Sequence, residues 1–136
     1  MNVLVDTDVV IEYLRGHRAV VIHFSSPRLT FYCSSITLSE VGASRHLSHA
    51  QRSFLGAKLR TILRVISHRD PVVMAAYDDL MRRHRADVLD RNDAVIAATA
   101  IAKRMPLWTH NRRHFEPIKG LRLFSPTVPS GGLGSG

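Results

Sequence analysis

Short apolar runs alternate with longer helical segments along this chain, and the alternation restricts its fold more than any other feature. Residues 2–5 and 29–34 are typical of buried strands, and further strands are expected at residues 64–67, 106–109 and 121–124. Strands that alternate with helices favour a parallel sheet covered by helices on both faces. The fold class expected is therefore α/β, with one domain and a central parallel sheet of four to five strands.

The helical segments begin at residue types that commonly cap helices. Apolar side chains in residues 9–14 have helical spacing. Thr37 and Glu40 have the three-residue spacing of a capping box, which predicts that a helix opens there and runs into the mid-forties. Three further helices are predicted at residues 50–63, from 71 to about 85, and at 90–103.

Charge is the second informative property. The chain has 136 residues, a length typical of one domain, and 19 Lys and Arg against 11 Asp and Glu give a net charge of +8. Sixteen of these cations are Arg, whose guanidinium group binds phosphate in a bidentate manner. Because 45% of the residues are hydrophobic, the charge is expected on a folded body. A nucleic acid or another polyanion is the first partner to consider, and a solvated basic surface is the alternative.

The composition also excludes several protein classes. Cys33 is the single cysteine, so neither a disulfide framework nor a cysteine zinc site is expected. The N-terminal run meets an acid after five residues, and no apolar stretch approaches the ~20 residues that span a bilayer. We expect a soluble protein of the reducing cytoplasm, folded over residues 1–126. Residues 127–136 are expected to be a flexible tail, with a Gly and Ser content typical of vector-derived sequence.

Four of the acids stand at predicted helix starts. Asp6 follows the first strand, Glu40 opens the helix after the second, and Asp90 and Asp93 begin a later helix. Helix capping is one interpretation of these acids, with Asp8 as the cap of the first helix. The carboxyl ends of parallel strands, however, meet at one edge of a sheet, and ligands bind there. We therefore expect the four side chains to gather in one pocket.

A pocket of carboxylates requires a counter-charge or bound protons. Two unit charges ~5 Å apart repel by roughly 3 kcal/mol at an effective dielectric constant near 20. Carboxylate oxygens are the ligands that Mg²⁺ and Mn²⁺ prefer. Such a metal ion polarises a phosphodiester and lowers the pKa of a bound water. Acids that hold a metal ion, surrounded by arginines that hold phosphate, are typical of a nuclease.

Four blocks of sequence occur in a characteristic order: DTDVVIEYLRG, ITLSEVGA, DAVIAATAIAKRMPLWTHNRRHF and IKGLRL. They extend from about residue 2 to residue 125. Together they resemble the PIN-domain ribonucleases, in particular the VapC toxins of prokaryotic toxin–antitoxin pairs. The resemblance implies that residues 1–126 form a PIN domain that hydrolyses RNA phosphodiester bonds as a metal-dependent endonuclease.

The resemblance also implies roles for individual acids. Asp6, Glu40 and Asp93 match the catalytic acids that bind Mg²⁺ or Mn²⁺ in the family. Asp90, three residues before Asp93 and on the same helix face, is a further candidate ligand. Asp8 stands where the family commonly has Ser or Asn.

Three polar residues are expected to support these acids. Thr7 matches the threonine beside the first acid, where its hydroxyl would support Asp6, and Thr109 lies in the later THNRRHF block. Asn111 stands where the family often has a further acid, and its amide adds no negative charge. Whether the site binds one or two metal ions therefore stays open.

Basic and aromatic residues near this edge have two interpretations. Four arginines would clamp RNA phosphates or stabilise charge in the transition state, and exposed surface charge is the alternative. His114 is expected to pack or hydrogen-bond within its loop, and Trp108 is expected in the core rather than as a platform for a base. The four arginines are Arg112, Arg113, Arg91 and Arg15.

The resemblance further implies partners. A cognate VapB-like antitoxin would hold the nuclease inactive, because an inserted arginine can replace the metal ion in an acidic pocket. A homodimer is also expected, with the apolar faces of the first helices as its interface.

Two other functions are considered. A catalytically silent PIN-like module would bind RNA or protein, but the presence of all three acids disfavours it. The run VLVDTDVV also fits the haloacid-dehalogenase phosphatases, in which the first aspartate is a nucleophile. Those enzymes need a further acidic pair late in the chain, whereas only Glu116 follows Asp93 here.

Overall fold

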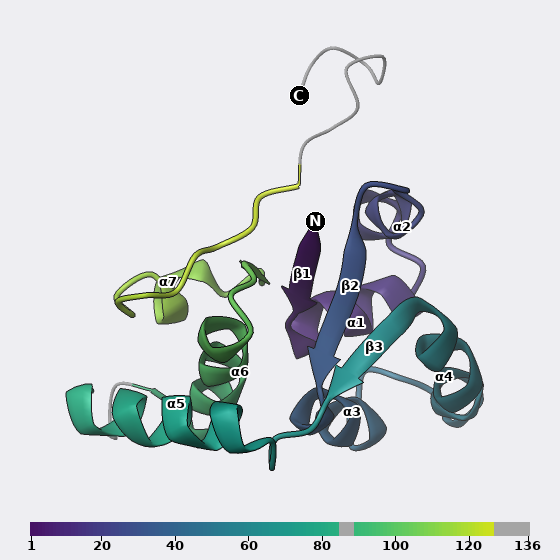
Figure 1. Cartoon of the computed structure of the whole chain (residues 1–136). Helices are drawn as coiled ribbons and strands as arrows, with labels where there is room; N and C mark the ends of the chain where they lie inside the picture. The colour runs from purple at the N-terminus through teal and green to yellow at the C-terminus, as the bar shows by residue number, and fades with distance from the viewer. Residues whose placement is uncertain (85–88, 127–136) are drawn as a thin grey trace.

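The computed structural model describes residues 1–84 and 89–126. The tail expected at residues 127–136, and the helix end expected at about residue 85, lie outside these ranges. Within them, four parallel strands form one sheet in the order β3-β2-β1-β4 (Figure 1). The strands are β1 (Asn2–Val5), β2 (Thr30–Ser34), β3 (Leu63–Ile66) and β4 (Leu107–Trp108).

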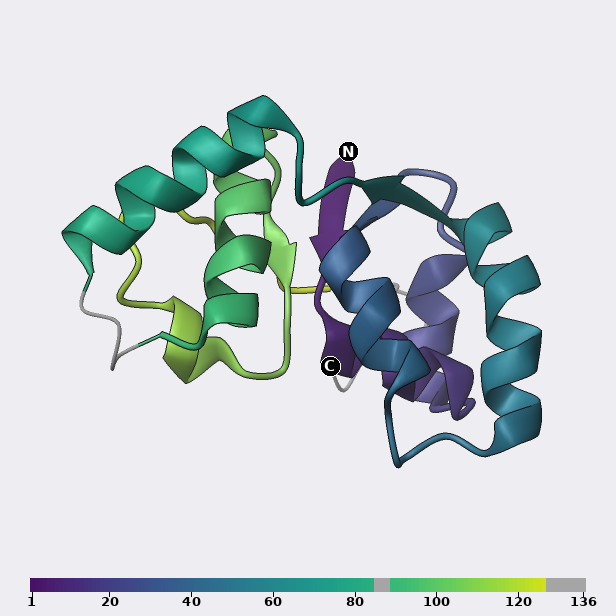
Figure 2. The ribbon, with the colours of Figure 1, turned by 90° about the horizontal axis from the view of Figure 1, so that it is seen from below.

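Helices cover both faces of this sheet, as Figures 1 and 2 show from two directions. One face packs against α1 (Thr7–Leu14), α2 (Arg18–Phe24), α3 (Ser35–Gly42) and α4 (His49–Ile62). The other face packs against α5 (Pro71–Arg83), α6 (Arg91–Ala102) and α7 (Arg112–Phe115). The predicted α/β class with a parallel sheet is confirmed. No helix in residues 1–84 and 89–126 has both the length and the apolar composition needed to cross a membrane.

Alternate residues of the central strand β1 face two separate hydrophobic cores. Val3 and Val5 pack in the core formed with α1–α4. Leu4 packs in the core formed with α5–α7, beside Leu80 and Ile96. All five side chains are fully or almost fully buried. A strand buried on both faces is typical of parallel sheets, and it fixes the position of the residue that follows its carboxyl end.

The fifth strand expected at residues 121–124 is reduced to one parallel bridge between Leu107 and Leu123. Leu107 N donates to Arg122 O, and Phe124 N donates to Leu107 O. Because β4 is only two residues long, it offers this segment no further backbone partners.

The start of α3 differs from the prediction, and α2 was missed. α3 begins at Ser35, because the Ser34 hydroxyl caps it by accepting from the backbone N of Ile36 at 3.1 Å. Thr37 is buried inside α3, so the predicted capping box of Thr37 and Glu40 was wrong. α2 was not predicted, because the apolar residues 19–22 are contiguous and show no helical period.

Both ends of α6 are tied down, which matters because this helix carries Asp93. Asp90 caps its start by accepting from the backbone N of Asn92 at 2.7 Å, as the capping interpretation expected. Just beyond its C-terminal end, Lys103 Nζ lies 2.9 Å from Oδ2 of Asp70, the residue that caps α5. This ion pair joins the start of α5 to the end of α6, and the two helices also pack together in the core that contains Leu80 and Ile96.

Candidate active site

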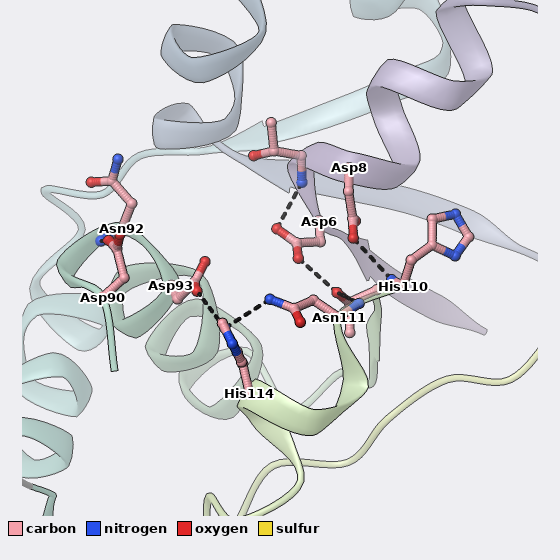
Figure 3. A network of polar contacts seen from close by, with 10 residues as sticks. Asp6, Asp8, Asp90, Asn92, Asp93, His110, Asn111 and His114 are labelled. Atoms are coloured by element: carbon pink, nitrogen blue, oxygen red, sulfur yellow. Dashed lines mark hydrogen bonds and ion pairs between the residues drawn. The ribbon is translucent and has the colours of Figure 1, made fainter. Parts of the chain in front are cut away.

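The carboxyl ends of the strands bring the predicted acids to one edge of the sheet. Asp6 follows β1 and is the N-cap residue of α1. Glu40 lies on α3, which follows β2 directly, and Asp93 lies in the first turn of α6. Figure 3 shows Asp6 and Asp93 directed into one space, with Asp8 beside Asp6 and Asp90 near Asp93. Segments far apart in the sequence therefore bring Asp6, Glu40, Asp90 and Asp93, the acidic group, to one edge of the sheet, where charges within the group act on one another.

Asp6 is the most buried of these acids, with 5% of its surface exposed. Its Oδ1 accepts from the backbone N of Thr7 at 2.7 Å, and its Oδ2 accepts from the hydroxyl of Thr109 at 2.7 Å. Burial raises the pKa of Asp6 to about 7, and repulsion from Asp8 and Asp93 adds to this effect. The two hydrogen bonds lower the pKa but do not offset the burial. Thr109 thus contacts Asp6 from the position expected of a supporting residue.

Glu40 is held by two polar side chains from other elements. The hydroxyl of Thr7 donates to Glu40 Oε1 at 2.6 Å and also lies 3.2 Å from the hydroxyl of Thr37. Asn92 Nδ2 donates to Glu40 Oε2 at 3.4 Å. The Thr7 hydroxyl therefore supports Glu40 rather than Asp6. Thr7 contacts Asp6 only through its backbone N. Asn92 was not predicted, because an asparagine in the first turn of a helix has no distinctive pattern.

Asp93 faces the segment that follows β4. Its Oδ2 lies 3.6 Å from His114 Nδ1, and Asn111 Nδ2 lies 2.8 Å from the same nitrogen (Figure 3). Burial raises the pKa of Asp93, and repulsion from Asp90 adds to it. His114 lies on α7 and makes the expected local hydrogen bond, with Asn111 at the start of that helix. It also contacts Asp93, which the sequence did not predict.

Asp8 does not cap α1, because Asp6 occupies the N-cap position. Instead, Asp8 accepts from the backbone N of Val9 at 2.7 Å and from that of His110 at 3.1 Å. His110 Nε2 in turn lies 2.7 Å from Glu12 Oε2. Burial raises the pKa of Asp8, and the charge of His110 opposes this shift. Asp8 thus joins the start of α1 to the loop after β4, across a separation that no local sequence pattern reveals.

Trp108 anchors the start of that loop. Its indole is 2% exposed and packs against the rings of Phe24, Phe31 and Phe124, with centroids 5.4, 5.9 and 5.8 Å away. The prediction that Trp108 belongs to the core is confirmed. Thr109, the next residue, is consequently held against Asp6 by a rigid neighbour.

The oxygen-rich donor set of this acidic group fits a divalent cation. Besides burial, repulsion from neighbouring carboxylates raises the pKa values of Asp6 and Asp93, and a bound cation would relieve it. In the part of the chain that the structure describes, however, no three His, Cys, Asp or Glu side chains are arranged around one metal position. Asp6 and Glu40 each bind a hydroxyl group. Joint binding of one ion by Asp6, Glu40 and Asp93 therefore requires these side chains to turn.

The four predicted arginines do not gather around the acids. Arg15 is the C-cap residue of α1, at the end of that helix away from the acidic group. Arg91 begins α6 and lines a neighbouring pocket of about 390 Å³. Arg112 donates to the backbone O of Phe124 at 3.3 Å, and Arg113 is exposed on α7. Three of the four thus lie on helices that border the acidic group, and Arg15 does not.

The fold and the acidic group match one known family. A family model of the PIN domain matches residues 3–120, and the chain belongs to this family. The run VLVDTDVV falls within the match, so the interpretation of that run as a haloacid-dehalogenase motif has no support.

Individual relatives are similar over nearly their whole length. Ribonuclease VapC1 from Methanocaldococcus jannaschii is 30% identical over 129 residues, which cover 90% of this chain and 87% of that protein. A solved structure of VapBC2 from Rickettsia felis, bound to a promoter DNA fragment, has a TM-score of 0.79 at 23% identity and covers 93% of this chain and 100% of the other. A toxin–antitoxin complex from Klebsiella pneumoniae has a TM-score of 0.71 at 24% identity, with coverage of 93% and 99%. At these identities the two structures show a shared fold.

The raised pKa of Asp6 predicts a pH-dependent stability that Asp6→Asn removes. Between about pH 4 and pH 7 the folded wild type binds a proton that the unfolded chain has lost, so its stability falls as the pH rises. The loss amounts to roughly 1.4 kcal/mol for each unit of the pKa shift. In EDTA, urea unfolding should therefore show that Asp6→Asn gains stability relative to wild type from pH 5 to pH 8. Altered hydrogen bonds to Thr7 and Thr109 add only an offset independent of pH, so an equal difference at both pH values would contradict the prediction.

Proposed function

We propose that this protein is a metal-dependent endoribonuclease that hydrolyses RNA phosphodiester bonds and is neutralised by a cognate antitoxin. One observation carries the proposal: Asp6, Glu40 and Asp93, from three separate parts of a PIN domain, lie at one edge of the sheet on a chain of net charge +8. The similarity to Ribonuclease VapC1 supports RNA as the substrate. RNA is a cytoplasmic substrate, and we infer that the protein acts there.

The three carboxylates would hold Mg²⁺ or Mn²⁺, with Asp90 as a further candidate ligand. When bound, the metal ion would polarise the scissile phosphodiester and lower the pKa of an attacking water. In the present arrangement Thr109 holds Asp6 and Thr7 holds Glu40, and these carboxylates would turn from the hydroxyl groups to share one ion. The amide of Asn111 adds no negative charge to this set of ligands.

Basic residues on the bordering helices would position the RNA backbone. Arg112 and Arg113 lie on α7, and Arg91 lies beside Asp90 at the start of α6. Guanidinium groups there would bind phosphates in a bidentate manner and bring a polyanion to an acidic group that repels it. Arg15 is less suited to this role, because it lies at the far end of α1. Phosphate contacts of this kind position RNA without selecting a sequence.

Cleavage of RNA with and without divalent metal tests the mechanism. In Mg²⁺ or Mn²⁺, wild type should cut RNA, and EDTA should abolish the reaction. Asp6→Asn and Asp93→Asn should each lower the rate by at least about 100-fold, because each removes a charge needed at the reacting phosphate.

Asp79→Asn is the matched control, because Asp79 is exposed on α5 and pairs only with Arg82 and Arg83 among the described residues. It should cut at the wild-type rate. Equal cleavage by wild type and both site variants, or cleavage in EDTA, would overturn the mechanism. RNA binding without cleavage by wild type would favour the silent PIN-like module instead.

A cognate VapB-like antitoxin is the protein partner we infer. Several similar structures are toxin–antitoxin complexes. The acidic group would accept a guanidinium in place of a metal ion, since both are cations that relieve the repulsion among Asp6, Glu40 and Asp93. Inhibition by the antitoxin should therefore weaken as Mg²⁺ rises from 1 to about 20 mM at constant ionic strength. Inhibition that is independent of Mg²⁺ would show that the antitoxin acts elsewhere.

We also infer a homodimer, supported by exposed apolar side chains. The apolar face of α1 is used in the core, where Val9 and Val10 are fully buried, so it is not available as an interface. Val65, Val72 and Met74 are instead 43%, 54% and 51% exposed on β3 and α5. Another exposed apolar side chain, Ile22, lies on α2.

Two charge substitutions distinguish these surfaces. Light scattering at about 50 μM should give a dimer mass for wild type and for Ile22→Glu, and a monomer mass for Met74→Glu, because a carboxylate at an apolar interface is costly to bury. Both side chains are half exposed, so neither change should unfold the monomer. A monomeric wild type would contradict the dimer, and a monomer mass for Ile22→Glu alone would move the interface to α2.

A further inference from the structure

A pocket of about 550 Å³ lies directly beside the acidic group. Its walls come from α1, the start of α2, the end of β4, α7 and the C-terminal segment. Thr109 lines this pocket and also contacts the acidic group, since its hydroxyl donates to Asp6 at 2.7 Å. A ligand in the pocket would therefore be adjacent to a phosphodiester held at the acids. The volume falls in the range of small-molecule sites.

The pocket combines aromatic surface with a few polar groups. Phe124 is partly exposed and forms the aromatic surface of its wall, and the buried Trp108 packs against the Phe124 ring with centroids 5.8 Å apart. The polar lining includes Glu12, His110 and Arg112, all partly exposed. RNA-binding proteins recognise unpaired bases by this combination, stacking them on aromatic or Arg groups and hydrogen-bonding their Watson–Crick edges.

We propose that this pocket binds one base of the RNA next to the scissile phosphate and that Glu12 selects guanine there. The proposal rests on the proposed ribonuclease function and adds a specificity-determining residue to it. Neither the acidic group nor the phosphate-binding arginines can distinguish one base from another.

The chemistry of Glu12 favours guanine over the other bases. Its carboxylate is a pure acceptor with about four lone-pair positions, of which the short contact from His110 Nε2 to Oε2 occupies one. His17 Nδ1 lies 3.6 Å from Oε1, too far for a strong hydrogen bond. Guanine is the one RNA base with two adjacent donors, N1–H and the N2 amino group, on its Watson–Crick edge. Both can donate to one carboxylate, whereas adenine, cytosine and uracil offer one such donor each.

His110 and Arg112 hold the pocket in shape. The backbone N of His110 donates to Asp8 while its ring contacts Glu12, so the carboxylate is oriented from the side of the acidic group. Arg112 donates to the backbone O of Phe124 at 3.3 Å and to the hydroxyl of Ser125 at 3.2 Å. These contacts fix the C-terminal segment as one wall of the pocket.

Nucleotide binding tests the pocket without any need for cleavage. Trp108 is the single tryptophan of the chain and lines the pocket, so its indole N–H signal in NMR spectra reports binding there. Guanosine 5′-monophosphate should shift this signal at concentrations about tenfold lower than adenosine 5′-monophosphate does, as expected for one bidentate contact. Glu12→Gln should reverse the order, because an amide donates one hydrogen bond and accepts another, which matches adenine. Inosine 5′-monophosphate, which lacks the N2 amino group, should bind wild type more weakly than the guanine nucleotide.

Asp79→Asn changes the net charge of the protein as Glu12→Gln does and should keep the preference for guanine. An unchanged ratio of guanine to adenine binding in Glu12→Gln, or no shift with any of the nucleotides, would overturn the proposal. Sequencing the products of a random RNA pool separates it from the proposed function. Guanine-selective binding without cleavage would support the proposed base pocket and contradict the proposed nuclease function. Cleavage with no base preference, together with no NMR shift, would support the nuclease function and contradict the base pocket.

Discussion

The structure depends on a carboxylate that is buried at the end of its central strand. Asp6 follows β1, which has a hydrophobic core on each face and strands on each side, so the carboxylate has little freedom to move into solvent. Burial makes its charge costly, and the hydrogen bonds from Thr7 and Thr109 reduce that cost only in part. A site of this kind is unfavourable for the empty protein and favourable for a cation, which is the usual trade between stability and function.

The general architecture could be predicted from the sequence because it follows from patterns within short segments. Strands at residues 2–5 and 29–34 are dense in β-branched and apolar residues, and their alternation with helices leaves few topologies other than a parallel sheet. The gathering of Asp6, Glu40 and Asp93 then follows from the geometry of such a sheet. α2 and the start of α3 were missed or misplaced, because a contiguous apolar run and a serine cap resemble other local patterns.

The contacts among the site residues could not be predicted in this way. Thr7 was expected beside Asp6 from its place in the sequence, yet its side chain reaches Glu40, since it lies on the first turn of α1 and faces α3. The links of Asn92 to Glu40 and of Asp8 to His110 join segments 52 and 102 residues apart. Such pairings depend on the rotation of each helix about its axis, which packing decides and local sequence does not.

The acidic group straddles the boundary between the two cores. Asp6, Thr7 and Glu40 belong to the half built around α1 and α3, whereas Asp93 and His114 belong to the half built around α6 and α7. The side-chain hydrogen bond from Asn92 on α6 to Glu40 on α3 crosses this boundary. A small shear of one half against the other would therefore change the separation of the carboxylates while leaving both cores intact. The relative position of the two halves would therefore set the separation of the carboxylates, on which the binding of an ion depends.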